Sequence, residues 1–345
     1  MNAHDPAWQQ FDAVSALAQA GKWQEAIPQY EALDYRDLPS DLCAHLCNDL
    51  GVAYQSTGEL DKALERFRQS WEIYERDKNK LGAAIALGNL GTVHTQRREW
   101  ANAVQCFERS LIVFENLKID NLAVAKLRVD MGDSLVATGK PRAACELYEL
   151  ALARQEAEGD KHGQAVTLHA LGTALRARSR WEDGIGAFER SIALFEELGD
   201  AQSIATTLNR LGELQYERHD YENAIETFRR DLKLSESLKN PKAIAQAVNN
   251  LGLAQLALKN FEQAAAQFRR AIPLWEKLGD EFGLALSLWG HAQLLYEQDR
   301  SAEAQAEGER ARAILERVQR PEEADVRKWL AAIRRGKRTG IRRYI

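Results

Sequence analysis

The chain has 345 residues, of which 45% are hydrophobic and 28% charged, and its formal net charge is −5. About two average domains would fit this length, and the overall acidity weighs against a protein dedicated to nucleic acid. No apolar run approaches the roughly 18 residues of a membrane-spanning helix, so no membrane span is expected.

The first predicted element is a degenerate helix pair at residues 7–40. It carries Trp23, Ala26 and Tyr30 at spacings that recur through the rest of the chain, with Val14 where the later copies have a glycine. Atypical end units are expected in a stacked array, because their outer face meets water.

The same pattern then recurs in six copies, which we place at residues 44–80, 84–121, 125–161, 165–201, 205–241 and 245–281. Each copy has a glycine preceded by Leu or Met, and the glycines are 40 or 41 residues apart: Gly51, Gly91, Gly132, Gly172, Gly212 and Gly252. Sixteen residues after each glycine comes a large aromatic: Phe67, Phe107, Tyr148, Phe188, Phe228 and Phe268. A fixed period of this length predicts a stacked array of helix pairs.

The glycine and the aromatic have a physical role in each copy. We expect the glycine on a first helix where the second helix crosses closely, and the aromatic on the second helix, filling the space between neighbouring copies. Burying one such ring contributes about 1.5–3 kcal/mol. Past the aromatic, helical spacing continues to Gly199-Asp200 and Gly279-Asp280, which predict a helix-ending glycine followed by the capping aspartate of the next helix.

The C-terminal region is predicted in three parts: a weak eighth pair at 285–318, a capping helix at 321–335 and a basic tail at 336–345. Gly308 takes the place of the large aromatic in the eighth pair, and Trp329, Leu330 and Ile333 give the capping helix an apolar face. Six cations follow within a stretch that has no acid: Arg334, Arg335, Lys337, Arg338, Arg342 and Arg343. This tail could bind nucleic acid or an acidic partner; the alternative is a solubilising tail.

The motif Asn89-Leu90-Gly91, with Trp100, Ala103 and Phe107 downstream, resembles the tetratricopeptide repeat. The resemblance spans nearly the whole chain, and repeats of about 40 residues are similar to those of kinesin light chains, spindle-orientation adaptors and bacterial signalling proteins. It implies an all-α, right-handed solenoid of about eight antiparallel helix pairs over residues 1–320, followed by the capping helix. Members of those families bind peptides or partner domains.

The sequence carries no recognisable catalytic or phosphate-binding motif, and the seven histidines do not cluster. Cys43 and Cys47 lie four residues apart, but two such ligands make a weak metal site, and packing of Cys47 in the core is the favoured alternative. The scattered cysteines and the polar first residues are typical of a cytoplasmic protein. We therefore predict a non-enzyme with no metal and no cofactor.

In the resembling family the first helices line a concave groove. The implied groove positions lie two and three residues before each glycine and one and four after it. The candidate residues chosen from them are Asn48, Asp49, Asn89, Asp130, Asp133, His169, Arg176, Asn209, Arg210, Tyr216, Asn249, Asn250, Trp289 and Tyr296.

The asparagines suggest how a peptide is held, because an amide side chain can both donate to and accept from a peptide backbone. The alternative is that they bond within the repeat and steady it. Amide contacts alone fall short of the roughly −8 kcal/mol of a micromolar complex, so Tyr216, Trp289 and Tyr296 are predicted as aromatic anchors. Acids toward the N-terminal half and arginines beyond them predict a ligand of mixed charge that is basic at one end.

The sequence therefore predicts a non-catalytic scaffold or adaptor that binds a peptide or partner domain, as a regulatory subunit of a larger complex. The alternatives are a nucleic-acid-associated accessory protein, with the basic tail as its binding segment, and a peptide sensor whose solenoid pitch changes on binding.

Overall fold

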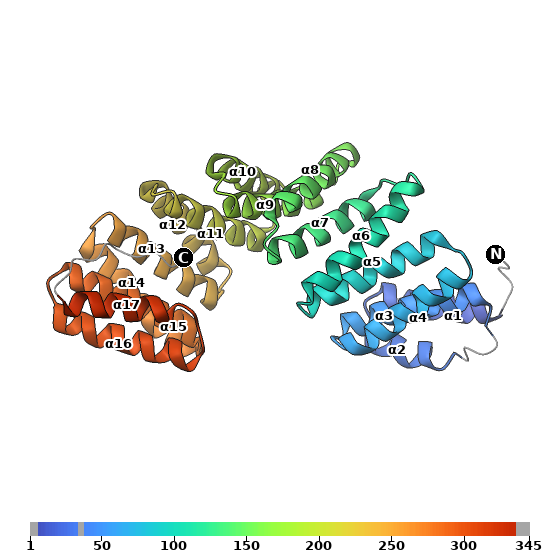
Figure 1. Ribbon diagram of the computed structural model, residues 1–345, viewed down its shortest axis with the longest axis horizontal. Coiled ribbons are helices and arrows are strands. Elements are labelled where there is room, and N and C mark those ends of the chain that lie inside the picture. Colours follow the sequence, from blue (N-terminus) through green and yellow to red (C-terminus); the bar gives the residue numbers. More distant parts are fainter. Residues whose placement is uncertain (1–5, 34–37, 336–345) are drawn as a thin grey trace. The chain divides into compact units, whose positions relative to one another are not determined.

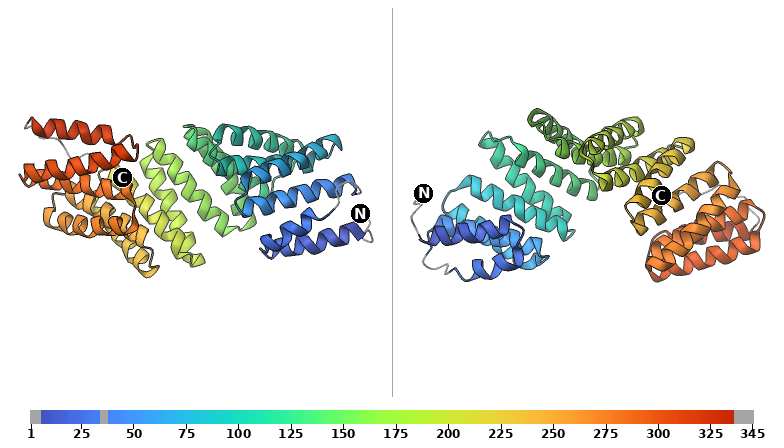
Figure 2. Two further views of the ribbon diagram at one scale, coloured as in Figure 1. Left: turned by 90° about the horizontal axis from the view of Figure 1, so that it is seen from below. Right: turned by 180° about the vertical axis from the view of Figure 1, so that it is seen from behind.

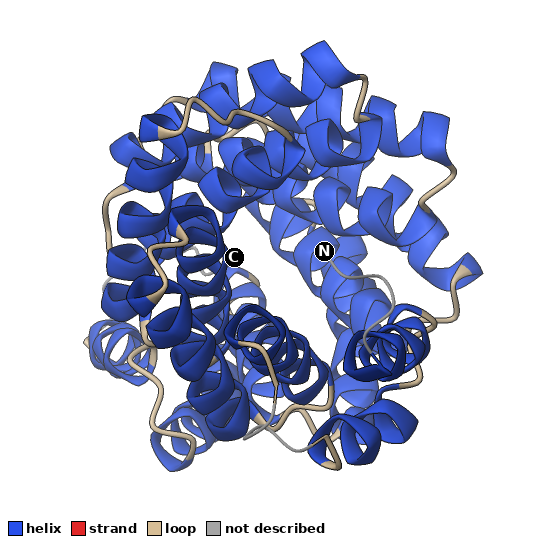
Figure 3. Ribbon diagram, turned by 90° about the vertical axis from the view of Figure 1, so that its right-hand side faces the viewer, coloured by secondary structure: helices blue, strands red, loops and turns tan. Residues whose placement is uncertain are grey.

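The computed structural model describes residues 6–33 and 38–335, and these form helices and connecting turns without any strand (Figures 1 and 3). The predicted all-α fold class is confirmed. The residues group into two compact units, 1–174 and 175–345, whose boundary falls within helix α9.

Unit 1 is a stack of antiparallel helix pairs. Each pair consists of a first helix and a second helix that pack on each other, and the second helices α2, α4 and α6 pack on the first helices α3, α5 and α7 that follow them. The helices are α1 (Pro6–Gln19), α2 (Trp23–Glu31), α3 (Ser40–Ser56), α4 (Leu60–Arg76), α5 (Lys80–Gln96), α6 (Trp100–Asn116), α7 (Leu122–Ala137), α8 (Pro141–Glu158) and α9 (Lys161–Ala177).

Unit 2 is likewise built of antiparallel helix pairs, and Figure 2 shows its helices from two further sides. Three pairs, α11 with α12, α13 with α14 and α15 with α16, follow α10, and α17 packs on α16. The bounds are α10 (Trp181–Leu198), α11 (Ala201–Glu217), α12 (Tyr221–Ser237), α13 (Pro241–Ala257), α14 (Phe261–Leu278), α15 (Glu281–Glu297), α16 (Ser301–Arg317) and α17 (Glu323–Arg334).

The repeated glycines allow the two helices of a pair to approach closely. A methyl group at Gly91 would lie 2.5 Å from Cε1 of Phe107, and one at Gly212 would lie 2.5 Å from Cε1 of Phe228. Both rings are fully buried. A Cβ atom cannot be accommodated at these distances without moving a ring, so the predicted reason for the glycine is confirmed.

The predicted helix boundaries at Gly199-Asp200 are also present. Gly199 ends α10 with a left-handed backbone at φ 71°, and the Asp200 side chain accepts a hydrogen bond of 3.1 Å from the Ser203 amide. Such a cap is worth about 1 kcal/mol. Other turns use a non-glycine residue at the same left-handed position, which no residue pattern predicted: Lys78, Arg98, Lys118, Ser179, His219, Lys239, Lys259, Asp299 and Gln319.

Helix α17 completes the core at the C-terminal end of unit 2. A methyl group at Gly308 would lie 2.9 Å from both the Trp329 and the Leu330 side chains, so the missing aromatic leaves room for α17. Trp329 and Leu330 are each 2% exposed and join one core cluster with Ala304, Ala311 and Leu315. The packing surface that the last pair lacks is supplied by this helix.

Candidate functional site

The polar residues predicted on the first helices of unit 1 bond to one another. The Asn89 Nδ2 atom donates to Asn48 Oδ1 at 2.8 Å, which joins α5 to α3. Asp49 Oδ2 accepts longer hydrogen bonds, each 3.5 Å, from the hydroxyls of Ser15 and Tyr30. These contacts link residues that are 19 to 41 positions apart in the chain. Some of the predicted polar residues therefore hold adjacent repeats together.

Two of the predicted aspartates, Asp49 and Asp133, have a raised pKa. Burial raises the pKa of Asp49, and crowding by the surrounding protein raises the pKa of Asp133. Asp133 is nevertheless exposed on its outer side, and its Oδ1 atom accepts a 2.6 Å hydrogen bond from the Tyr148 hydroxyl. Asp130, one turn away, accepts from Lys126 at 2.7 Å.

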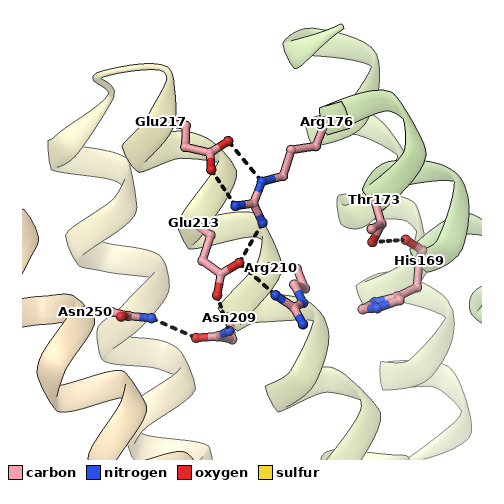
Figure 4. Close-up of polar contacts among 8 residues, drawn as sticks. All are labelled: His169, Thr173, Arg176, Asn209, Arg210, Glu213, Glu217 and Asn250. Carbon is pink, nitrogen blue, oxygen red and sulfur yellow. Dashed lines mark hydrogen bonds and ion pairs between the residues drawn. The ribbon is translucent and has the colours of Figure 1, made fainter. Parts of the chain in front are cut away.

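In unit 2 four of the predicted residues, Arg176, Asn209, Arg210 and Asn250, belong to one polar network (Figure 4). Arg176 donates from Nη1 to Glu213 at 2.7 Å and from Nε to Glu217 at 2.9 Å. Arg210 donates from Nη1 to the same Glu213 oxygen at 3.0 Å. Burial alone would lower the pKa of Arg176, but hydrogen bonds and charge from Glu217 and Glu213 raise it overall. Glu213 is 2% exposed, and two guanidinium groups neutralise it.

The asparagines of unit 2 extend this network along the stack (Figure 4). Asn209 donates to Glu213 Oε1 at 2.8 Å and accepts from Asn250 Nδ2 at 3.0 Å. Asn249 Oδ1 accepts from the Ser287 hydroxyl at 2.8 Å. The Asn250–Asn209 and Ser287–Asn249 bonds run between neighbouring repeats, whereas the Asn209–Glu213 bond lies within a repeat, as the alternative stated above expected. Each amide has two donors and two lone pairs, so the Asn249 nitrogen and the Asn250 oxygen keep bonding capacity.

Two cavities lie along these first helices of unit 2. The larger, about 400 Å³, is lined by residues of α11, α13, α14 and α15 and by Glu322: Arg210, Glu213, Lys242, Gln246, Asn249, Asn250, Trp275, Asp280, Phe282, Gly283, Leu286 and Glu322. The smaller, about 160 Å³, shares Arg210 and Gln246 with it and is also lined by Gln202, Ala205, Thr206, Asn209, Asp231 and Ala243. The shared residues make the two cavities neighbouring parts of one groove.

The larger cavity has buried polar groups without a partner. Within the described residues, neither Nε1 of Trp275 nor Oε2 of Glu322 has a hydrogen-bond partner. An unpaired buried polar atom costs about 1–3 kcal/mol. A ligand that offered an acceptor to the Trp275 nitrogen and a donor to the Glu322 oxygen would recover that energy.

Two of the predicted aromatic anchors are corrected by the structure. Tyr216 and Trp289 are each 1% exposed, so neither ring is available to a ligand. Tyr216 packs in one cluster with Leu251 and Leu253 of α13, and Trp289 packs with residues of α17. The third predicted anchor, Tyr296, is partly buried and meets Trp329 edge-on at 6.2 Å between ring centroids. Phe282 and Leu286 line the larger cavity and take over the apolar role.

The remaining candidates are His169 on α9 and the six basic residues from Arg334 onward. His169 is partly buried on α9, and its carbonyl oxygen accepts a 3.1 Å hydrogen bond from Thr173 (Figure 4). Arg334 lies in α17 and donates to Glu309 at 2.5 Å, so it is less available to nucleic acid than the sequence suggests. Arg335 is exposed. Lys337, Arg338, Arg342 and Arg343 lie outside the described residues.

Over residues 6–33 and 38–335 no group of three or more His, Cys, Asp or Glu side chains is arranged to hold a metal ion. Burial raises the pKa of the Cys47 thiol to about 11, as expected for a packed cysteine. None of the helices described in the structure has the length and apolarity needed to cross a membrane.

Sequence reasoning missed Asp231 on α12. It stands three residues after Phe228, where the corresponding second helices have Ser70, Ser110, Ala151, Ser191 and Ala271. Asp231 is 2% exposed, and burial raises its pKa to about 7. An acid in a column of small residues is a signal that aligning the repeats would have revealed.

Comparison with known proteins agrees with this architecture. The apo form of RapI is 14% identical, with a TM-score of 0.68, over 84% of this chain and 81% of that one. A Rap protein complexed with Competence and Sporulation Factor is 13% identical (TM-score 0.56) and covers 96% of this chain and 98% of its own. Aspartyl phosphate phosphatase F from Bacillus subtilis is 14% identical (TM-score 0.60), covering 100% and 98%. These similarities establish the fold alone.

No sequence among the curated proteins matches the chain. The tetratricopeptide repeat family model matches residues 41–116, 123–197, 163–237 and 243–317, which together exceed half of the sequence. With the repeated glycine–aromatic contacts and the antiparallel helix pairs, this match shows that the chain belongs to the tetratricopeptide repeat family.

Proposed function

We propose that this protein is a non-catalytic scaffold that binds an extended segment of another protein along the first helices of unit 2. The observation that carries the proposal is the pair of neighbouring cavities beside Asn209, Asn249 and Asn250. A backbone segment presents alternating donors and acceptors, and the spare amide groups can match both.

The energetics are consistent with binding of an unstructured segment. Four or five spare polar groups contribute about 0.5–1.5 kcal/mol each, which falls below the roughly 8 kcal/mol of a micromolar complex. Contact with Phe282 and Leu286 in the larger cavity adds apolar burial at about 25 cal/mol per Å². Ordering the segment opposes both contributions.

The comparisons support a binding role by analogy. One similar structure is a Rap protein complexed with Competence and Sporulation Factor. Another is named an aspartyl phosphate phosphatase, so the fold does not decide between binding and catalysis. Here both Arg176 and Arg210 donate hydrogen bonds to the Glu213 carboxylate. This pairing favours a structural role for Glu213. We infer a regulatory subunit that acts in the cytoplasm by recruiting or controlling a partner.

A site-specific crosslinking experiment tests the proposal. A photoreactive amino acid replaces Gln246, which lines both cavities, and a matched protein carries it at the exposed Arg229 on the second helix α12. Both are irradiated in extract of the native cell. We expect a discrete protein adduct from position 246 and none from position 229. Equal labelling from the two positions, or none at 246, contradicts the proposal.

A further inference from the structure

The second helix α12 departs from the repeat pattern at two positions one turn apart. Asp231 replaces the small residue of the other repeats. Ser235 stands where the corresponding second helices have a larger side chain: Tyr74, Phe114, Gln155, Phe195 and Trp275. The fifth complete repeat has thus gained a carboxylate and lost a large side chain on the same face of one helix.

The smaller cavity lies where the other repeats have their large side chain. In other repeats the large side chain packs on the start of the next first helix; a methyl group at Gly82 would lie 2.5 Å from Tyr74, and one at Gly283 would lie 2.6 Å from Trp275. The corresponding residue opposite Ser235 is Ala243, which lines the cavity of about 160 Å³. One water needs about 10–15 Å³ of such volume, so the cavity has room for several waters and for a guanidinium or ammonium group.

The carboxylate in this cavity is buried and only half satisfied. Asp231 is 2% exposed and lines the cavity. Its Oδ1 atom accepts a 3.0 Å hydrogen bond from the Ser235 hydroxyl, which is the one partner that it has among the described residues. The exposed residues Gln202, Thr206 and Arg210 also line the cavity, so it is reached from the surface.

Among residues 6–33 and 38–335, no cation forms an ion pair with Asp231. The charged group that acts on its carboxylate is Glu213, which is also an acid and raises the pKa of Asp231 further. Arg210 lines the same cavity, but its guanidinium donates to Glu213 at 3.0 Å. A buried carboxylate without a counter-ion is costly, and its charge is stabilised when a cation enters beside it.

We propose that the cavity beside Asp231 is a subsite for a basic side chain, arginine or lysine, of the bound polypeptide. The cation pairs with the free oxygen of Asp231, and the side-chain amides of Asn209 and Gln246 supply acceptors at the wall. This assignment rests on the proposed function, since it identifies a side chain that the groove selects. It places the basic recognition point in unit 2, whereas the sequence prediction placed it beside the acids of the N-terminal half.

The test uses the full-length protein and two small probes, Nα-acetyl-arginine amide and its neutral near-isostere Nα-acetyl-citrulline amide, at pH 8. Binding is followed by the backbone NMR signals of Ala205 and Ala243. We expect saturable shifts with the arginine probe and binding at least about tenfold weaker with the citrulline probe. Asp231→Asn should weaken arginine binding by a similar factor, and Asp231→Ser, which restores the residue of other repeats, should do the same.

Glu222→Gln removes an exposed acid from the same helix and is the matched control; it should leave binding unchanged. Equal binding of both probes, unchanged binding by the two Asp231 variants, or shifts confined to other parts of the chain would overturn the assignment. The outcome is separable from the proposed function. A partner that crosslinks at position 246 equally well in wild type and Asp231→Asn defeats the subsite alone, whereas arginine binding without any crosslinked partner defeats the scaffold role alone.

Discussion

Gly212→Ala tests the contact on which the repeat depends. The new methyl group would lie 2.5, 2.7 and 2.9 Å from three atoms of the Phe228 ring, which is fully buried. Gly186→Ala is the matched control in the same unit. Gly186 lies inside α10, and no heavy atom is within 4 Å of the position of its new methyl group.

The expected magnitudes have opposite signs. Alanine is favoured over glycine inside a helix by about 1 kcal/mol, and Gly186→Ala should gain this amount. Gly212→Ala gains the same propensity but forces the Phe228 ring to move in a packed core, which costs about 1–3 kcal/mol or more. Because backbone and core surround the ring, we expect the upper end and a net loss of about 2 kcal/mol.

Thermal unfolding followed by circular dichroism measures both variants. With about 2–4 °C per kcal/mol for a unit of this size, Gly186→Ala should raise Tm by about 2–4 °C and Gly212→Ala should lower it by about 4–8 °C. Adding Phe228→Leu to Gly212→Ala should cost less than the sum of the single changes, because the two residues share one space. Equal Tm values for the two alanine variants would refute the close-approach argument.

Three further changes address the charged residues and the end of unit 2. Burial holds the folded-state pKa of Asp231 at about 7 against an ordinary value of 3.8, so its proton stabilises the fold below about pH 4 and this contribution is lost as the pH rises through 7. Asp231→Asn should therefore match wild type in urea unfolding at pH 4 and exceed it at pH 8, by up to about 4 kcal/mol; an equal difference at both pH values would contradict this. Glu213→Gln should cost about 1–3 kcal/mol in the same assay, because Arg210 loses its partner while Arg176 keeps Glu217, and an unchanged midpoint would count against a stabilising network. Trp329→Ala should cost about 3–5 kcal/mol and speed hydrogen exchange in α16, since the ring fills the space over Gly308; exchange that increases only in α17 would argue against this packing.

The misplaced anchors show where repeat register alone is insufficient. Tyr216 and Tyr296 occupy the same position of their repeats, four residues after the conserved small residue. Tyr216 is buried against α13, whereas Tyr296 is partly exposed beside α17. A sequence position specifies a helix face, but the distance to the next first helix decides whether that face meets protein or solvent.

The sequence by itself determined the period, the helix pairs and the close contacts, because these depend on residue sizes at fixed spacings within one repeat, such as Gly91 against Phe107. Only the tertiary structure decided which polar groups are free to bind a ligand. Asn48 and Asn89, and likewise Asn209 and Asn250, share one hydrogen bond across 41 residues, and the cavity beside Asp231 forms between side chains of separate helices. Hydrogen-bond partners and empty volume are set by distances of a few ångström between helices, and no local pattern of residues specifies those distances.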